Sequence, residues 1–358
     1  MRLLIITQKI DDNDAVLGFM HGWIVEFSRQ AQSVVAVCLG KGEAHLPDNV
    51  GVFSLGKEHG ASRVARIFNF YKIIWRTRRE YDAVFVHMNP EYIVLGGLFW
   101  KLWGKTVTLW YAHKSTPWHL RAAHFLTDIV FTSTTSGFRL PSSKVKVVGQ
   151  GIDTSRFKIQ DSRFRSNGEE FRIVSVGRIS PSKDYETLIE AMDVVCKDSK
   201  LKIKVDIIGP TSVDSDRKYL ESLKDSVAKK DLVSVINFLG PVPNTELPDV
   251  LSDYDLFVNM GQTGSLDKAV PEAMASGLPV LTCNEAFKEV LGPFKADLMY
   301  PKGDFQALSV KIKDMIQMPE NKRIELGQSL RDIVVNDHSL KNFVGKIIVT
   351  IEAFEKHE

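Results

Sequence analysis

Short runs of apolar, mostly β-branched residues alternate with stretches of helical periodicity along the whole chain. Runs of this kind are typical of strands that are buried on both faces of a sheet. They lie at residues 2–7, 33–39, 83–87, 107–111, 129–132 and 145–148 in the first half, and at 172–177, 204–208, 235–239, 256–259 and 279–282 in the second. The alternation predicts an α/β protein built on parallel sheets.

The pattern occurs twice, so the chain is predicted to fold as two domains. A polar stretch within residues 150–171 separates the two series of strands and is interpreted as a linker. The predicted domains span residues 1–160 and 161–338, and 358 residues are enough for two cores. A last helix is predicted at 339–358, where one face carries Phe343, Ile347, Ile348, Ile351 and Phe354.

Composition narrows the function classes. The chain has 46 Lys and Arg against 44 Asp and Glu, so its net charge of +2 does not indicate a nucleic-acid partner. Cys38, Cys196 and Cys283 are widely spaced and odd in number, as in a cytoplasmic protein with reduced thiols and neither disulfides nor a cysteine metal site. No apolar run reaches membrane-spanning length, and the first strand is too short for a signal peptide.

The stretch from residue 256 to 282 predicts a strand, a loop, a short helix and a second strand. Asp267 is predicted to cap the helix, and Gly277 with Pro279 to end it. A loop that opens onto a helix N-terminus favours a bound anion such as a diphosphate. Glu272, just inside the helix, can accept hydrogen bonds from vicinal hydroxyls such as those of a ribose.

Two cations lie about ninety residues upstream. Arg178 follows a strand that ends at Gly177, and Lys183 precedes the next helix. Ligands of open α/β sheets bind at the carboxyl ends of strands, where these two charges can neutralise a leaving diphosphate. The plainer explanation is that both are solvated surface charges, and it weakens when the downstream helix is considered with them.

The two segments together resemble a known family. The sequences SVGRISPSK at 175–183 and VPEAMASGLPV at 270–280 are similar to the donor half of retaining GT-B glycosyltransferases, in the large nucleotide-sugar-dependent family four, also called group 1. The resemblance implies two Rossmann-like domains facing a central cleft. It implies that residues 1–160 form the acceptor-side domain and that residues 161–338 bind the nucleotide-sugar donor. The helix at 339–358 is expected to pack back on the first domain.

The resemblance also implies the reaction. A sugar moves from a nucleotide-diphosphate donor to a hydroxyl of a glycan or lipid-linked acceptor, with retention and with no metal or other cofactor. Arg178, Lys183 and His113 correspond to catalytic positions, and an ordinary loop histidine is the less favoured explanation of His113. The donor-binding positions are Glu272, Gly264, Ser265, Leu266, Asp267, Lys268, Gly209, Pro241 and Val242.

One departure concerns the donor loop. The family pattern has two glutamates with seven residues between them, and Gly264 stands where the first, which contacts the sugar, is expected. One hypothesis is that Lys268 or the loop amides take over a phosphate or sugar contact. In the plainer account Asp267 only caps the helix and Lys268 is solvated.

The acceptor side is less defined. Gly18 and His21 lie in a segment that borders both substrates in the family, although Gly18 is also explained by helix packing. His87 ends a strand and is predicted, with less support, to line the same cleft. Residues 63–79 predict a basic amphipathic helix that could rest on an anionic membrane, which would place the protein at the inner face of the membrane. An ordinary core-facing helix with a solvated rim is the slightly favoured explanation.

Two other classes of function fit parts of the pattern. A non-catalytic, nucleotide-binding GT-B partner of an active transferase would explain Gly264. A GT-B epimerase or phosphorylase is less favoured, because the paired donor motifs resemble those of transferases.

Overall fold

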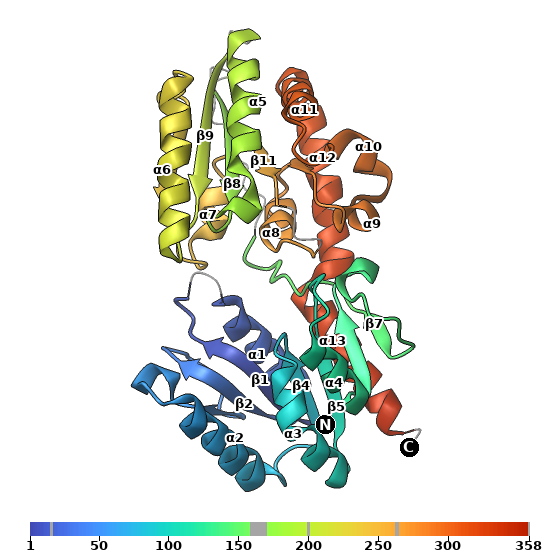
Figure 1. Cartoon of the computed structure of the whole chain (residues 1–358). Helices are drawn as coiled ribbons and strands as arrows, with labels where there is room; N and C mark the ends of the chain where they lie inside the picture. Colours follow the sequence, from blue (N-terminus) through green and yellow to red (C-terminus); the bar gives the residue numbers. More distant parts are fainter. Residues whose placement is uncertain (15–16, 158–169, 199–200, 262–264, 357–358) are drawn as a thin grey trace. The chain divides into compact units, whose positions relative to one another are not determined.

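The chain folds into two compact units. The computed structural model describes residues 1–14, 17–157, 170–198, 201–261 and 265–356 (Figure 1). The first unit consists of residues 1–153 and 337–358, and the second of residues 154–336. Most of the linker predicted at 150–171, including the predicted boundary at 160, lies outside the described residues. No helix in the described ranges is long and apolar enough to cross a membrane.

The first unit is built on a parallel sheet with the order β3-β2-β1-β4-β5-β6-β7 in its described residues. The strands are β1 (Arg2–Ile10), β2 (Ser33–Lys41), β3 (Val50–Ser54), β4 (Ala83–His87), β5 (Thr106–Trp110), β6 (Ile129–Thr132) and β7 (Val145–Val147). The helices are α1 (Phe19–Gln30), α2 (Arg63–Thr77), α3 (Glu91–Leu102), α4 (Trp118–Leu126) and α13 (Leu340–Glu355), with short turns η1 (Lys57–His59) and η2 (Thr135–Gly137).

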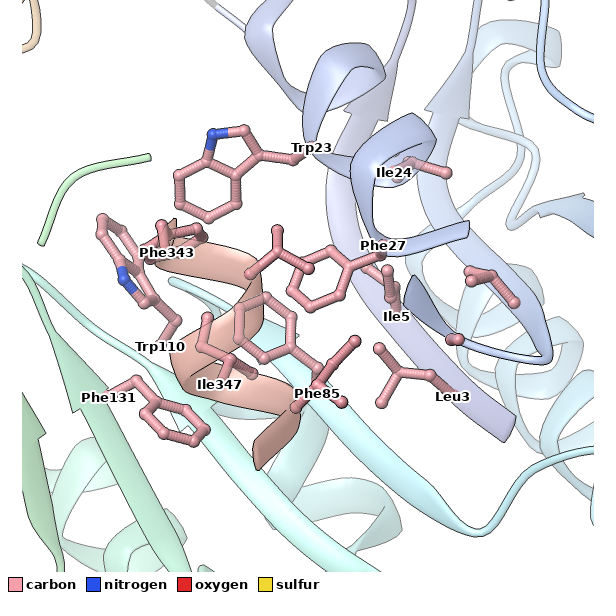
Figure 2. Packing of buried hydrophobic residues seen from close by; sticks show 14 of the residues in the cluster. Leu3, Ile5, Trp23, Ile24, Phe27, Phe85, Trp110, Phe131, Phe343 and Ile347 are labelled. Carbon is pink, nitrogen blue, oxygen red and sulfur yellow. The ribbon is translucent and has the colours of Figure 1, made fainter. Parts of the chain in front are cut away.

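Alternating side chains of the strands build a core on each face of this sheet. Leu3 and Ile5 of β1 face the layer formed by α1 and α13, where Phe343 packs on Trp23 with 4.3 Å between ring centroids (Figure 2). Leu4 and Ile6 face the opposite layer, formed by α2, α3 and α4. Burial on both faces explains why these strands are continuous apolar runs in the sequence.

Sequence reasoning located six of these strands and missed β3. This strand pairs only with β2 at the edge of the sheet, and its residues are half-buried or exposed. Its sequence, with Gly51 at the second position, lacks the buried apolar run on which the other predictions rest.

The second unit contains a parallel sheet with the order β10-β9-β8-β11-β12 in its described residues. Its strands are β8 (Glu170–Val176), β9 (Lys202–Ile208), β10 (Ile236–Gly240), β11 (Leu256–Asn259) and β12 (Val280–Thr282). The helices are α5 (Tyr185–Asp198), α6 (Asp214–Lys229), α7 (Leu247–Leu251), α8 (Ala269–Ala275), α9 (Phe287–Leu291), α10 (Lys295–Leu298), α11 (Phe305–Gln317) and α12 (Glu320–Ile333), with turns η4 (Pro181–Lys183) and η5 (Gly292–Phe294). A further helical turn, η6, spans Val334–His338.

Helix α8 is short and buried throughout. All seven of its residues are buried, and it contacts α12, β11 and β12. Gly277 ends it with φ of 71°, as its position before Pro279 predicts. Small side chains let α12 approach closely, since a Cβ added at Gly327 would lie 2.0 Å from the Gly277 carbonyl oxygen.

Candidate functional site

The strand order of the second unit creates a switch point between β8 and β11. The chain proceeds from β8 outward to β9 and β10, then returns to the other side of β8 to form β11 and β12. Loops that leave the carboxyl ends of β8 and β11 therefore diverge, and ligands of open α/β sheets bind in the crevice between such loops. Arg178 and Lys183 follow β8, while residues 265–268 follow β11.

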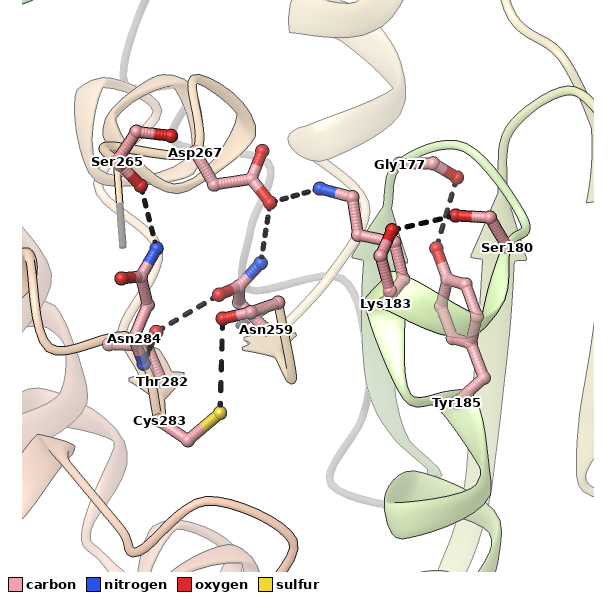
Figure 3. A network of polar contacts seen from close by, with 12 residues as sticks. Gly177, Ser180, Lys183, Tyr185, Asn259, Ser265, Asp267, Thr282, Cys283 and Asn284 are labelled. Atoms are coloured by element: carbon pink, nitrogen blue, oxygen red, sulfur yellow. Dashed lines mark hydrogen bonds and ion pairs between the residues drawn. The ribbon is translucent and has the colours of Figure 1, made fainter. Parts of the chain in front are cut away.

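An ion pair joins these two loops. The Lys183 ammonium contacts Oδ2 of Asp267, and Asn259 Nδ2 donates to the same oxygen at 3.0 Å (Figure 3). The side chains of Lys183 and Asp267 are 16% and 13% exposed, so the pair is partly shielded from water. The structure thus brings together two residues 84 positions apart that the sequence assigned to the donor site.

The hydrogen bonds continue from Asn259 into the loop. Thr282 Oγ1 donates to Asn259 Oδ1 at 3.0 Å and accepts from the Asn284 amide at 3.1 Å. Asn284 Nδ2 then donates to the Ser265 carbonyl at 2.8 Å. Asn259, Thr282 and Asn284 are buried, so this relay holds the 265–268 loop in position (Figure 3).

The prediction that Asp267 caps the helix is wrong. Lys268 occupies the N-cap position of α8 and makes no side-chain cap hydrogen bond. The Asp267 carboxylate instead contacts Lys183 and Asn259. A charged donor forms a stronger bond with a carboxylate than a neutral backbone amide does, which accounts for the difference.

Arg178 is the more accessible of the two cations. Its side chain is 52% exposed, and its Nε lies 4.0 Å from Oδ2 of Asp216, beyond hydrogen-bond distance. Asp216 in turn accepts from the Ser212 amide at 3.0 Å. The guanidinium therefore has donors available for an incoming anion.

Gly209 allows the loops after β8 and β9 to approach each other. A Cβ added at Gly209 would lie 1.9 Å from the Gly177 carbonyl oxygen, which no side chain can tolerate. The Gly209 amide donates to Gly240, and the Gly177 amide to Ile208, at 2.8 and 2.9 Å. Gly209, a donor-binding position implied by the family resemblance, thus shapes this edge of the sheet through its backbone.

Glu272 and Lys268 form an electrostatically coupled pair at the start of α8. Burial raises the pKa of the Glu272 carboxyl, while the charges of Lys268 and then Arg156 oppose that rise. Burial also lowers the pKa of the Lys268 ammonium, which Glu272 partly offsets. Desolvation is thus the largest influence on each group, as expected for charges removed from water.

Arg156 is a neighbour of this pair that sequence reasoning missed. Its guanidinium donates to Oδ1 of Asn244 at 2.8 Å and also to the Asn244 carbonyl. The loop after β10 that contains Asn244 also contains exposed Pro241 and half-buried Val242, two predicted donor positions. Arg156 therefore links this loop to the electrostatic surroundings of Glu272.

Of the remaining predicted donor residues, Ser265 and Leu266 lie next to the hydrogen-bond relay of Asn259, Thr282 and Asn284. Leu266 is buried, and Ser265 is half-buried with its carbonyl held by Asn284. Gly264 lies outside the described residues.

The predicted acceptor residues of the first unit have different surroundings. Gly18 precedes α1, and a Cβ there would lie 2.5 Å from the Asp14 carbonyl oxygen, so close backbone packing explains this glycine. The His21 ring contacts the His45 carbonyl at 2.7 Å. His87 is 4% exposed and stacks on Trp110 with ring centroids 5.2 Å apart.

His113 follows β5 on a loop at the carboxyl edge of this sheet. It is half-buried, and its Nδ1 accepts from the Ser115 amide at 3.1 Å. Nearby strand ends contribute buried polar atoms with no hydrogen-bond partner among the described residues: Trp110 Nε1, Thr132 Oγ1, Ser133 Oγ and Gln150 Oε1. Unpaired buried polar atoms are costly, so this edge of the sheet is suited to a polar ligand.

The second unit matches a family model. Residues 157–332 match the model described as glycosyl transferases group 1. This range covers nearly the whole of the unit that contains Arg178, Lys183, Asp267 and Glu272. Residues 157–332, about half of the chain, therefore form a domain of the glycosyl transferases group 1 family.

Individual members of the family are distant in sequence. Mannosylfructose-phosphate synthase of Agrobacterium fabrum is 26% identical over 151 residues, which are 40% of this chain and 33% of the relative. The amylovoran biosynthesis glycosyltransferase AmsK of Erwinia amylovora is 28% identical over 178 residues, 47% of this chain and 41% of the relative. The chain therefore spans less than half the length of these curated relatives in the matched regions.

Solved structures extend the likeness to the whole fold. HepE of Anabaena, solved in complex with UDP, matches with a TM-score of 0.80 at 16% identity and covers 99% of this chain and 100% of its own. The chain thus has the GT-B fold, with two Rossmann-like units.

Several site residues of this protein carry a weak signal in the sequence. Asn259 and Thr282 each end a buried apolar strand with a polar residue, which is typical of positions at a functional edge. Arg156 precedes the second series of strands and gave no comparable signal, since its relation to Glu272 exists only in the fold.

Proposed function

We propose that this protein is a glycosyltransferase that moves a sugar from a nucleotide-diphosphate donor to a hydroxyl of a glycan or lipid-linked acceptor, with retention and without a metal. The observation that carries this proposal is the meeting of Lys183 with the loop after β11 at the switch point, with Arg178 half-exposed beside it. The group 1 domain and the solved complexes of HepE with UDP and with UDP-glucose support it.

In this proposal the cations of the second unit stabilise the leaving group. The bond between the anomeric carbon and the diphosphate oxygen breaks, and the departing diphosphate gains negative charge near Arg178 and Lys183. The acceptor oxygen forms the new bond to the anomeric carbon on the same face, and its proton passes to the departing phosphate oxygen. Charge that develops during bond cleavage is where preorganised cations contribute most to the rate.

Side chains must supply most of this stabilisation, because α8 is short. A helix of seven residues aligns few peptide dipoles, so its macrodipole is small. Glu272, buried at the start of α8, is assigned to the ribose hydroxyls. Its carboxylate accepts hydrogen bonds best when ionised, which the charges of Lys268 and Arg156 favour.

Nucleotide binding is the first test of the proposal. Isothermal titration of the wild type with UDP, GDP and ADP should show binding of one nucleotide, and Arg178→Ala should weaken it at least tenfold through loss of a charged contact. Lys202→Ala is the matched control, since Lys202 starts β9 at the opposite edge of the same sheet and pairs with Glu170. Binding of no nucleotide, or equal loss in the two variants, would contradict the donor site.

The reaction itself needs a second assay. With the nucleotide identified, the matching nucleotide sugars are incubated with glycan and lipid-linked acceptors, and the anomeric configuration of the product is read by NMR. Retention in the presence of EDTA is the expected result. Inverted product or dependence on a divalent metal would refute those parts of the proposal, and binding without turnover on any acceptor would favour the non-catalytic partner suggested by Gly264.

A second part of the proposal is peripheral contact with an anionic membrane through α2. The sequence favoured a core-facing helix, but only Phe70, Ile74 and Thr77 of α2 are buried. Val64, Phe68 and Trp75 are 78%, 71% and 57% exposed, and α2 contains no acidic residue.

The neighbouring helices extend this apolar surface. Tyr71 of α2 contacts Phe99 of α3, and the rings of Trp75 and Trp103 lie 5.6 Å apart. Leu98 and Leu102 of α3 are also exposed. Exposed apolar and aromatic side chains among arginines suit the headgroup region of an anionic bilayer, where a lipid-linked acceptor would lie.

Vesicle binding tests this contact. The wild type should co-sediment with vesicles that contain phosphatidylglycerol and much less with pure phosphatidylcholine. Charge reversal of Arg76, Arg78 and Arg79 to Glu should abolish that binding, because about 1 kcal/mol per basic residue is lost and repulsion is added. Reversal of Lys224 and Lys229 on α6 of the second unit is the control, and an equal effect there would contradict a surface on α2.

A further inference from the structure

The ion pair between Lys183 and Asp267 raises a question about the donor site, and the following inference rests on the proposed function. Lys183 is the cation assigned to the diphosphate, yet in the described structure its ammonium already contacts a carboxylate. Both side chains are largely shielded from water. A partly buried lysine paired with an aspartate is close to neutral as a unit, and so attracts an anion less than a lone lysine would.

The Asp267 carboxylate contacts Lys183 in the way that a phosphate oxygen would. A carboxylate oxygen and a phosphate oxygen are both anionic acceptors at similar hydrogen-bond distances from an ammonium group. Oδ2 of Asp267 accepts from two nitrogen donors, Lys183 Nζ and Asn259 Nδ2. These are donors that an anionic ligand oxygen could also use.

Glycine backbone lies beside each member of the pair. A Cβ added at Gly177 would lie 3.4 Å from Lys183 Nζ, and one added at Gly261 would lie 3.0 Å from Asp267 Oδ2. The absence of side chains at Gly177 and Gly261 leaves the ammonium and the carboxylate free of steric barriers from these two positions. Rotation of the Asp267 side chain away from Lys183 therefore meets no obstacle there.

We propose that the Asp267 carboxylate competes with the donor's diphosphate for Lys183. Before the donor binds, the Asp267 carboxylate pairs with the Lys183 ammonium, and an incoming diphosphate displaces the carboxylate from it. The exchange breaks one charged contact and forms another, with no proton or covalent change. Asn259 retains its bond to the displaced carboxylate.

The isosteric variant Asp267→Asn tests the exchange. It removes the competing charge, so the nucleoside diphosphate that the wild type prefers among UDP, GDP and ADP should bind roughly fivefold to tenfold more tightly. Inorganic pyrophosphate should gain a similar factor in affinity. The corresponding nucleoside, which has no phosphate, should bind to the variant and to the wild type with equal affinity. Unchanged or weaker diphosphate binding in the variant would overturn the proposal.

Two controls separate exchange from other effects. Glu170→Gln removes a carboxylate that pairs with Lys202 at 3.0 Å at the opposite edge of the sheet, and should leave diphosphate affinity unchanged. In a Lys183→Ala background, Asp267→Asn should give a smaller gain, because no ammonium remains to be released. An equal gain in both backgrounds would mean simple repulsion, and would refute competition for Lys183.

Further outcomes keep this inference distinct from the proposed function. Asp267→Ser also removes the charge and replaces the first variant if circular dichroism shows that the latter is unfolded. If the wild type binds no nucleotide but Asp267→Asn binds pyrophosphate more tightly than the wild type, the exchange stands and the nucleotide assignment fails. If nucleotide binds the wild type and the two Asp267 variants alike, the nucleotide assignment stands and the exchange fails.

Discussion

Replacement of Asn259 by alanine should destabilise the second unit by an amount that its hydrogen bonds define. The side chain is 3% exposed, donates to the Asp267 carboxylate at 3.0 Å and accepts from Thr282 Oγ1 at 3.0 Å. A hydrogen bond to a charged group contributes about 1.5–3 kcal/mol and a neutral one about 0.5–1.5 kcal/mol. Their sum gives a loss of about 2–4.5 kcal/mol, or roughly 4–18 °C in the melting temperature of a unit of this size.

The distribution of tryptophan allows the two units to be followed separately. The tryptophans of the chain, at positions 23, 75, 100, 103, 110 and 118, all lie in the first unit. Tryptophan fluorescence therefore reports the first unit during thermal unfolding, while far-ultraviolet circular dichroism reports both. Asn259→Ala should lower the dichroism transition of the second unit and leave the fluorescence transition unchanged.

A matched control and a refuting result complete this experiment. Asn321→Ala changes an exposed asparagine on α12 of the same unit and should alter stability by less than about 0.7 kcal/mol, the range of helix propensities. A loss below about 1 kcal/mol for Asn259→Ala would refute the reasoning, because it would mean that the buried relay contributes no more than one neutral hydrogen bond. An equal loss in the fluorescence transition would show that the effect is not confined to the second unit.

Three further variants test other parts of the structure. Gly209→Ala should lower the stability of the second unit by several kcal/mol in the same dichroism assay, because its Cβ would lie 1.9 Å from the Gly177 carbonyl; a wild-type melt would contradict that close approach. Burial raises the pKa of the Glu272 carboxyl. Wild-type nucleotide affinity should therefore fall as the pH decreases through that raised value, because the carboxylate gains a proton. Glu272→Gln should bind nucleotide weakly and without this pH dependence, and parallel pH profiles of the two proteins in titration calorimetry would exclude a role of Glu272 in binding. Phe343→Ala removes a fully buried ring packed on Trp23 and should cost the first unit about 3–5 kcal/mol, seen in the fluorescence transition and not in the second unit.

Much of the fold could be predicted from the sequence because burial leaves a local signal. Strands such as β4 and β11 are covered on both faces, so every residue is apolar or ends the strand, and their predicted limits agree with the structure. Edge strand β3 lacks that burial and was missed. Helix α2 faces the core as predicted, with Phe70 and Ile74 buried, but Val64, Phe68 and Trp75 have the spacing of a buried face and are exposed.

The candidate site was likewise predicted only in part from the sequence. Arg178, Lys183 and Glu272 could be identified because each follows or begins a recognisable element in a motif typical of one family. The role of Asp267 could not, because helix capping is a local property, whereas its contact with Lys183 joins residues 84 positions apart. Arg156 likewise influences Glu272 only after the chain has folded.

The α/β class, the two series of strands and the two donor motifs could be read from the chain alone, since these depend on local periodicity and on residue types within a few positions. Three features depend on the folded chain: which charges meet at the switch point between β8 and β11, the contact of the Asp267 carboxylate with Lys183 in place of a cap on α8, and the exposure of Val64, Phe68 and Trp75 on α2. Electrostatic contacts and exposure depend on distances through space, and these are set only when the strands have paired and the helices have packed on them.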